Sequence, residues 1–324
     1  MTDPVRWGVL GASSSIFRRR VLPGMRDSPH VRLLATASRS GADHDSDAER
    51  RYGDYDELLA DPDVEAIYLP LPNAHHERWT VAAAQAGKHV LCEKPLGPDA
   101  DAARRMVAAC ADANVMLAEA YMTPFHPRSA RWEAMVADGS VGTPLHGTAR
   151  FSFPLPDPDD HRWWTDGGGA LLDVGIYCLE PLLAVGGWRP GDRPPQLAAH
   201  ASLTGSGVDA TFTGWLDLPS GFTGAFCCSF DAPEGQTLEV VGTGGSLRVE
   251  PAFTPARDDT AILATPRDGQ PLTIHSPPGE MYQLMVEHVG RVVREGVPPQ
   301  RPLEASIALA DLMDLLHASV GRTA

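Results

Sequence analysis

The chain has 324 residues, a length that usually divides into two domains rather than forming one hydrophobic core. An apolar fraction of 43% and a charged fraction of 21% are typical of a folded globular protein and exclude a disordered one. A formal net charge of −15 and the lack of a long apolar run argue against nucleic acid, an anionic membrane surface or a bilayer as partners.

Short β-branched runs alternate with amphipathic stretches in the first part of the chain. Strands are predicted at residues 5–10, 31–37, 66–71, 89–92 and 115–118, and helices at 13–25, 57–60, 76–86 and 99–113. Repeated strand–helix–strand units with short connections are typical of a doubly wound parallel sheet. We therefore predict an α/β domain over residues 1–120.

The pattern changes after residue 121, where short strands follow one another through Gly, Pro and Asp turns. After a helix at 128–138, strands are predicted at 145–153, 196–204, 210–218, 222–230, 237–241 and 245–249, and helices at 282–295 and 303–316. Tight turns between consecutive strands favour antiparallel pairing. We predict a second, α+β domain over residues 121–324, with closing helices that can pack back on the first domain.

A glycine–serine turn joins the first predicted strand to the first predicted helix. In dinucleotide-binding folds this turn places the pyrophosphate on amides at a helix N-terminus, and serine hydroxyls can add donors. We expect cofactor contacts from Gly11, Ala12, Ser13, Ser14, Ser15 and Ile16. The usual G-x-G-x-x-G motif is incomplete, so an ordinary loop turn is the alternative.

The end of the second predicted strand bears on the choice between NAD and NADP. A carboxylate at this place would bond the ribose hydroxyls of NAD and repel a 2′-phosphate. The sequence instead has Ser38, Arg39 and Ser40, and arginine can bind a phosphate through two parallel hydrogen bonds. These residues favour NADP(H) as the cofactor. The alternative is that Arg39 is merely a solvated side chain without a phosphate partner.

A lysine follows the strand at 89–92, at the carboxyl edge of the sheet where such folds bind ligands. Lys94, beside Glu93 and Pro95, could hold a substrate oxygen through a charged hydrogen bond. The alternative is a surface lysine in an ordinary turn.

A second candidate group follows the glycines at 167–169. Asp173 and Tyr177 are one helical turn apart, which places both on one face of an α-helix. A phenol aligned with a carboxylate suits a proton donor to a developing alkoxide. The alternative is a core tyrosine with a capping aspartate.

Several blocks taken in order resemble the Gfo/Idh/MocA family of oxidoreductases. They are GVLGASSS at 8–15, LPLPNAHHERW at 69–79, AGKHVLCEKPL at 86–96, EAYMTPFHP at 119–127 and GGGALLDVGIYCLE at 167–180. The resemblance implies a Rossmann domain followed by an α/β domain with an open, mostly antiparallel sheet. It implies that Lys94 is the family lysine of the EKP motif. It also implies that Asp173 and Tyr177 occupy the positions of the family aspartate and acid/base.

The resemblance implies further cofactor-site residues. Leu71, Pro72, Asn73 and His76 match a loop on the nicotinamide side, Glu93 and Lys94 border the cofactor, and Arg162 and Trp163 match a segment near the cofactor or substrate. The serine-rich phosphate turn departs from the family pattern.

The opening block and LPLPNAHHERW are most similar to the sugar-nucleotide 3-ketoreductases of that family. We therefore expect an NADP(H)-dependent oxidoreductase that reduces a ketone on a cyclic sugar. The leading substrate hypothesis is a nucleotide-linked 3-keto-deoxysugar. One alternative is an oxidative sugar (xylose- or glucose-type) or trans-dihydrodiol dehydrogenase. Another is an NADP-sensing binding protein without turnover.

The remaining expectations concern partners and location. The chain start does not resemble a signal peptide, and five cysteines without a CxxC pair indicate reduced thiols, so we expect a cytoplasmic protein. An open sheet in the second domain suggests a homodimer or homotetramer. The loop at 43–54 lacks the glycine and glutamate of a calcium site, and we expect no metal.

Overall fold

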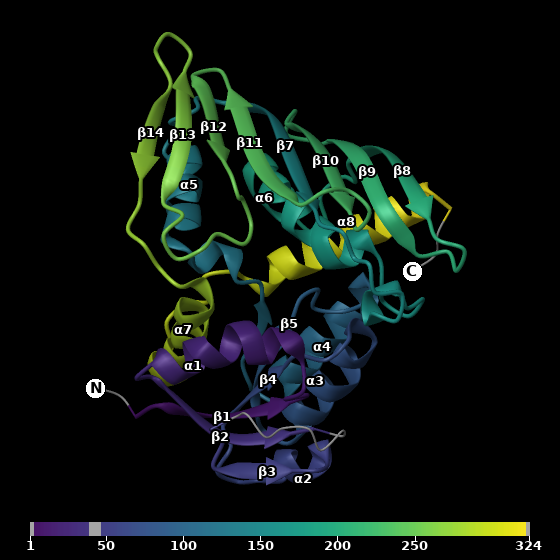
Figure 1. Ribbon diagram of the computed structural model, residues 1–324, viewed down its shortest axis with the longest axis vertical. Coiled ribbons are helices and arrows are strands. Elements are labelled where there is room, and N and C mark those ends of the chain that lie inside the picture. Colours follow the sequence, from purple (N-terminus) through teal and green to yellow (C-terminus); the bar gives the residue numbers. More distant parts are fainter. Residues whose placement is uncertain (1–2, 39–46, 322–324) are drawn as a thin grey trace. The chain divides into compact units, whose positions relative to one another are not determined.

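The computed structural model describes residues 3–38 and 47–321, and the chain forms two compact units (Figure 1). Unit 1 consists of Met1–Phe125 and Glu280–Ser306, and unit 2 of His126–Gly279 and Ile307–Ala324. Unit 1 is therefore discontinuous in sequence, because unit 2 lies between its two segments.

Unit 1 is built on a parallel sheet of six strands in the order β3-β2-β1-β4-β5-β6. The strands are β1 (Val5–Leu10), β2 (Val31–Ala37), β3 (Arg50–Tyr52), β4 (Ala66–Leu69), β5 (His89–Glu93) and β6 (Leu117–Ala120). The strand order reverses between β1 and β4, which is the switch point where doubly wound sheets bind ligands. The predicted doubly wound sheet is confirmed.

Helices cover both faces of this sheet, which agrees with the nearly continuous burial of its central strands β1 and β4. The helical elements are η1 (Phe17–Val21), α1 (Leu22–Asp27), α2 (Tyr55–Leu59), η2 (Asn73–His75), α3 (His76–Gln85), α4 (Ala100–Asp112), η3 (Thr123–Phe125) and α7 (Met281–Glu295). Helices α1 and α7 pack together on one face (Figure 1). On the other face α3 packs against α4, and Tyr55 of α2 makes an edge contact with Trp79 of α3.

Unit 2 is built on a sheet of eight strands in the order β14-β13-β12-β11-β7-β10-β9-β8. The strands are β7 (Pro144–Ser152), β8 (Gln196–Leu203), β9 (Asp209–Asp217), β10 (Thr223–Ser229), β11 (Gly235–Gly242), β12 (Gly245–Val249), β13 (Ala261–Pro266) and β14 (Leu272–His275). The pair β7–β10 is parallel and the other pairs are antiparallel. The predicted mainly antiparallel sheet is confirmed.

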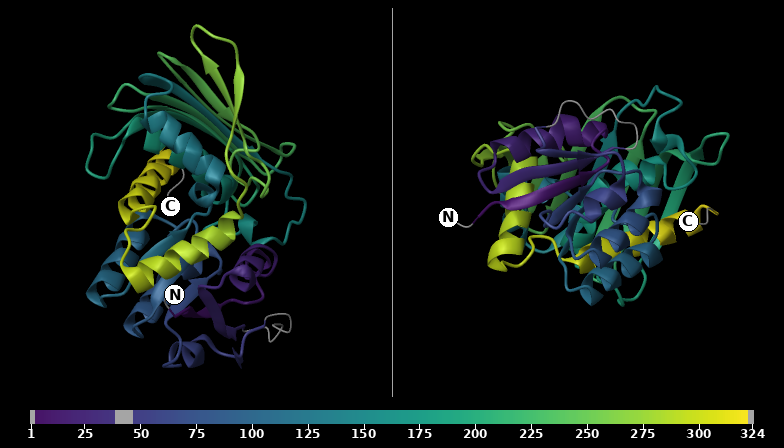
Figure 2. Two further views of the ribbon diagram at one scale, coloured as in Figure 1. Left: turned by 90° about the vertical axis from the view of Figure 1, so that its left-hand side faces the viewer. Right: turned by 90° about the horizontal axis from the view of Figure 1, so that it is seen from below.

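Helices cover one face of the eight-stranded sheet, as Figure 2 shows. They are α5 (Pro127–Ala137), the π-helical turn η5 (Leu171–Gly175), α6 (Ile176–Gly186) and the later part of α8 (Leu303–Ser319), while the short η4 (His161–Trp163) lies in a loop. Phe212 and Phe226 stack on the covered face, whereas Trp215 is exposed. Among the described residues, no helix covers the opposite face.

A helix needs about 20 mainly apolar residues to cross a lipid bilayer. Within residues 3–38 and 47–321, none is both long and apolar enough to cross a lipid bilayer.

Candidate active site

The turn between β1 and the first helix has the shape of a phosphate site. Gly11 adopts a φ of +98°, which L side chains rarely reach, and a Cβ there would lie 2.6 Å from Leu71 Cδ2. A side chain at residue 11 would therefore collide with the loop after β4. Glycine brings the two loops together at the switch point of the sheet.

The amides of this turn divide into two groups. The N–H groups of Gly11 and Ala12 both donate to the carbonyl of Ala37, at 2.9 and 3.1 Å, and the N–H of Ser14 donates to Gly11. The N–H groups of Ser13, Ser15 and Ile16 have no backbone acceptor among the described residues. Because they open a helix that runs from residue 15 to residue 27, they suit the anionic oxygens of a pyrophosphate.

These observations refine the predicted phosphate contacts. The backbone N–H groups of Gly11 and Ala12 hold the end of β2, and the two residues shape the turn. The turn as a whole fits a dinucleotide, because exposed Ser13 and Ser15 lie at the helix start beside N–H groups without a backbone acceptor among the described residues. The helix continues as the π-helical turn η1, a feature that often marks functional sites.

The residues predicted to select NADP lie at the end of β2. Ser38 is buried, and its N–H donates to the carbonyl of Tyr52 at 3.4 Å. Arg39 and Ser40 lie outside the described residues. The preference for a 2′-phosphate therefore remains a prediction from residue type.

Three buried side chains hold the backbone of residues 94–96, directly after β5. Glu93 accepts the Lys94 N–H at 3.2 Å, and the ring Nδ1 of His76 lies 2.9 Å from the Pro95 carbonyl oxygen. Glu119 of β6 accepts the Leu96 N–H at 2.8 Å. Each of three consecutive residues is thus held by a different side chain, and the position from which the partly exposed Lys94 extends is fixed.

The two carboxylates in this group have partners of their own. The Tyr68 hydroxyl donates to Glu93 at 2.6 Å, and burial together with the Glu93 charge raises the pKa of that phenol well above its ordinary value. Glu119 pairs with Arg301 and accepts the Ser306 hydroxyl at 2.7 Å. Roles for Tyr68, Glu119 and Arg301 were not predicted from the sequence. Two signals were available for Glu119: it is a carboxylate inside the apolar run LAEA, and it begins the family block EAYMTPFHP.

His76 links two loops rather than presenting a free ring to a ligand. It is fully buried, and Nε2 lies 2.8 Å from the Leu71 carbonyl oxygen while Nδ1 faces Pro95. Burial lowers the pKa of the ring. The predicted nicotinamide loop of Leu71, Pro72 and Asn73 is therefore tied to the Lys94 loop through His76.

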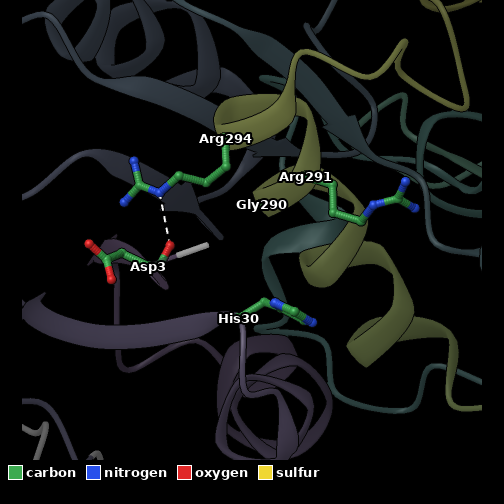
Figure 3. Close-up of a pocket in the computed structure, with 5 residues that line it drawn as sticks. All are labelled: Asp3, His30, Gly290, Arg291 and Arg294. Carbon is green, nitrogen blue, oxygen red and sulfur yellow. Dashed lines mark hydrogen bonds between the residues drawn. The ribbon is translucent and has the colours of Figure 1, made fainter. Parts of the chain in front are cut away.

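A small pocket elsewhere in unit 1 does not fit the predicted chemistry. It is lined by Asp3, His30, Gly290, Arg291 and Arg294 (Figure 3). Arg294 donates to the Asp3 carbonyl at 3.0 Å and is paired with Glu65, so its charge is already balanced. Asp3 and His30 precede β1 and β2, which puts the pocket at the amino edge of the sheet, whereas dinucleotides bind at the carboxyl edge.

The candidate residues of unit 2 are organised by a buried aspartate. Asp209, at the start of β9, accepts the Leu171 N–H at 2.7 Å and so caps the helix that carries Asp173 and Tyr177. Gly169 has a φ of +116°, and a Cβ there would lie 2.2 Å from the Asp209 carboxylate. The glycine run thus lets the chain pass directly over this carboxylate. Nothing in the sequence around Asp209 indicated this contact.

Asp173 and Arg162 form an ion pair in unit 2. Arg162 Nε lies 2.9 Å from Asp173 Oδ2, and its NH1 lies 3.0 Å from Asp160 Oδ2. The Asp173 carboxylate is the main cause of the raised pKa of Arg162, to which Tyr177 also contributes. Arg162 and Asp173, from separate sequence motifs, therefore meet at the start of the Tyr177 helix.

The local geometry of that helix differs from the predicted one. Asp173 belongs to the π-helical turn η5, and Tyr177 to α6. The wider turn changes the angle between the two side chains from that of a continuous α-helix. Tyr177 packs against Phe151 and Phe253, with ring centroids 5.3 and 6.1 Å away.

Trp163 faces its own unit. Its indole N–H donates to the Asp157 carbonyl at 3.0 Å, and its ring meets Phe230 edge-on at 5.2 Å. The structure thus accounts for Trp163 through packing, while Arg162 contacts Asp173 and Asp160.

Family models match both parts of the chain. Residues 5–121 match the oxidoreductase family with an NAD-binding Rossmann fold, and residues 130–248 match the GFO/IDH/MocA C-terminal domain. This chain belongs to the Gfo/Idh/MocA family. As a Gfo/Idh/MocA protein it is an oxidoreductase that acts on alcohol or carbonyl groups with a nicotinamide dinucleotide.

Similar Gfo/Idh/MocA proteins span nearly the whole chain. D-xylose 1-dehydrogenase (NADP(+)) 2 from Haloferax volcanii is 36% identical over 97% of this chain and 96% of its own. The trans-1,2-dihydrobenzene-1,2-diol dehydrogenase of Bos taurus is 32% identical over 98% of each chain. The solved structure of KijD10, a 3-ketoreductase from Actinomadura kijaniata in complex with NADP and TDP-benzene, is 28% identical over 99% of each chain, with a TM-score of 0.87.

Proposed function

We propose that the protein is an NADP(H)-dependent oxidoreductase that interconverts a secondary alcohol and a ketone, or a lactol and a lactone, on a cyclic sugar. The observation that carries the proposal is that three different side chains each contact one backbone group of residues 94–96. The turn that bears Lys94 is held in place by three buried side chains, those of Glu93, His76 and Glu119. Such fixing is what a charged catalytic group requires, because small displacements of a reacting partner cost rate.

Bound at the sheet edge beside Gly11, NADPH would supply the hydride for reduction and NADP+ would accept it in oxidation. The helix start at Ser13, Ser15 and Ile16 would hold its pyrophosphate, and Ser38 with Arg39 and Ser40 would receive the 2′-phosphate. The names of the Haloferax and Actinomadura proteins, which include NADP, support this choice of cofactor.

The chain's own residues then handle the substrate oxygen and its proton. The Lys94 ammonium polarises the oxygen and stabilises the charge that develops on it. The Tyr177 phenol exchanges the proton with that oxygen, and Asp173, held by Arg162, orients the substrate hydroxyls.

Two substrate classes are supported by different observations. Reduction of a nucleotide-linked 3-keto-deoxysugar is supported by the fold likeness to the KijD10 3-ketoreductase over 99% of each chain. Oxidation of a free sugar or a trans-dihydrodiol is supported by the higher sequence identities, 36% and 32%, to the xylose and dihydrodiol dehydrogenases.

Steady-state kinetics with both classes test the proposal. Purified enzyme should oxidise NADPH with a 3-keto-deoxysugar nucleotide, or reduce NADP+ with D-xylose or D-glucose. Lys94→Ala and Tyr177→Phe should each lower kcat by about a hundredfold or more, because each removes an acid–base or charge-stabilising group.

The double variant sharpens this test. If Lys94 and Tyr177 act on one oxygen, the losses in kcat/KM should be strongly non-additive, with the double variant close to the slower single variant. NADPH affinity, measured by fluorescence titration, serves as the control for folding. Single variants with wild-type kcat would refute the assigned roles, and binding of NADPH without any turnover would favour the sensing alternative.

A further inference from the structure

Trp164 stands apart from the other exposed apolar side chains. The residue is 46% exposed, and it lies in the loop after η4. Within the part of the chain that the structure describes, the other large exposed apolar residues all lie on strands of the eight-stranded sheet: Leu145, Leu203, Trp215, Val241, Leu263 and Leu272. The exposure of Trp164 therefore needs an explanation that does not involve the sheet.

The two adjacent tryptophans have opposite environments. The Trp163 indole is used inside unit 2, where its N–H donates to Asp157 and its ring meets Phe230. The Trp164 ring meets the His161 ring edge-on at a centroid distance of 6.1 Å. His161 is itself half exposed and contacts Asp160, so this side of the loop remains open to solvent.

The backbone of Trp164 is rigidly held. Its N–H donates to His161 at 3.1 Å, and its carbonyl accepts the Gly168 N–H at 3.0 Å. A Cβ at residue 168 would lie 2.4 Å from the carbonyl oxygens of both Arg162 and Trp164. Only glycine permits this approach, so the glycine run fixes the Trp164 backbone against the start of the Tyr177 helix.

Hydrogen bonds connect Arg162, two residues before Trp164, to Asp173 in two steps. The Gly169 N–H donates to the Arg162 carbonyl at 2.8 Å, and the Asp173 N–H donates to the Gly169 carbonyl at 3.1 Å. The side chain of Arg162 also forms an ion pair with Asp173. An exposed, fixed indole therefore belongs to the same turn as the carboxylate that is proposed to orient substrate hydroxyls.

An apolar ring beside a carboxylate matches the chemistry of a cyclic sugar. Hydroxyls lie around the rim of such a ring and need polar partners, whereas its C–H faces favour an aromatic surface. We propose that the Trp164 indole stacks on the ring face of the substrate and selects cyclic substrates over open-chain polyols. This inference rests on the proposed function, because it takes the substrate to be a cyclic sugar.

Kinetics of Trp164 variants with D-xylose and xylitol as probes test the inference. Trp164→Ala should raise KM for D-xylose tenfold or more, with kcat within threefold and KM for NADP+ within twofold of wild type. Trp164→Phe should recover much of the affinity, because it keeps an aromatic face. The preference for D-xylose over xylitol should shrink in Trp164→Ala. An unchanged KM for D-xylose, or a loss confined to kcat or to NADP+ affinity, would overturn the inference.

A binding measurement separates this inference from the proposed function. Tryptophan fluorescence of the enzyme saturated with NADPH, which cannot oxidise an aldose, is titrated with D-xylose and with D-glucose. Trp164→Phe should lose the sugar-dependent change, whereas Trp215→Phe, which removes another exposed indole of unit 2, should keep it. A change that persists in Trp164→Phe, or no change in the wild type, counts against stacking. Failure of turnover with an intact Trp164-dependent signal would refute only the proposed reaction.

Discussion

Glu119 and Arg301 form a buried ion pair behind the Lys94 loop. Their side chains are only 3% and 7% exposed, and Glu119 also accepts the Leu96 N–H. A buried charge that loses its partner keeps the full cost of desolvation. The pair therefore matters for stability as well as for the position of the loop.

We predict that Glu119→Gln lowers the free energy of unfolding by about 3–5 kcal/mol, because Arg301 is left as an uncompensated buried charge. The turnover number should fall as well, since the hold on Leu96 weakens. Urea unfolding and steady-state kinetics measure the two effects.

The matched control for this prediction is Glu49→Gln, which removes an ion pair with Arg32 in which both side chains are about half exposed. Exposed pairs contribute little, so stability and kcat should stay near those of wild type. Equal losses in the two variants would contradict the distinction between buried and exposed pairs.

At the scale of elements, the Tyr177 helix depends on a cap from a distant strand. Asp209→Ala leaves the Leu171 N–H without its acceptor and removes the carboxylate beneath Gly169. We predict at least a tenfold loss of kcat with an unchanged affinity for NADPH, because Asp209 acts in unit 2 and the residues proposed to hold the pyrophosphate and the 2′-phosphate lie in unit 1.

Asp99→Ala provides the comparison. Asp99 caps α4 by accepting the Ala102 N–H at 2.7 Å, so its loss should cost about 1 kcal/mol of stability but leave kcat unchanged. Asp209→Asn, which keeps an acceptor oxygen, should recover part of the activity. An Asp209→Ala variant that loses stability and keeps full kcat would show that the cap is only structural.

The elements themselves were largely predictable from periodicity. Strand β1 was predicted with its observed ends, because apolar residues buried on both faces form a continuous run bounded by glycine. Strand β3 was missed since Arg50, Arg51 and Tyr52 carry no apolar pattern, and β14 was missed since its four residues are largely exposed. Strand β13, whose residues alternate between exposed and buried, was missed as well. Such strands form because a neighbouring strand offers unpaired backbone groups.

The site was predictable only in part. Lys94, Asp173 and Tyr177 stand in recognisable motifs, whereas the contacts that hold them come from tertiary structure. Asp209 lies 38 positions beyond Leu171, and Arg301 lies 182 positions beyond Glu119. A local sequence pattern cannot predict that the start of β9 lies beside the glycine turn at 167–169.

At the scale of the whole molecule, buried histidines make stability depend on pH. Burial lowers the pKa of His76, His89, His126 and His288. Ring nitrogens of the last three accept backbone N–H groups, from Met116, Arg128 and Gln300 respectively. A protonated ring cannot accept these bonds.

We predict that the protein loses stability on acidification. A histidine whose pKa is lowered in the folded state binds protons more readily when unfolded, where the pKa is about 6.5. The free energy of unfolding should therefore fall as pH drops through about 6.5 and on toward the lowered folded values. Urea unfolding at several pH values between 7.5 and 5.5 measures the slope.

One carboxyl group acts in the opposite sense. Desolvation and the nearby Glu180 raise the pKa of Glu133 to about 8, so its protonation favours the folded state. Its side chain is exposed, so water screens this effect and the histidines should dominate. His89→Asn keeps an acceptor for Met116 and should reduce the slope, and a stability that is flat or rises toward pH 5.5 would contradict the prediction.

The split of unit 1 into two stretches of sequence has a consequence for biosynthesis. Helix α7 covers a face of the Rossmann sheet, and Arg301 neutralises Glu119 beneath the Lys94 turn, yet both emerge from the ribosome after all of Met1–Gly279. During synthesis, the nucleotide-binding unit therefore cannot complete its fold until the intervening region has been translated. Until then its sheet lacks helix α7, and Glu119 lacks Arg301.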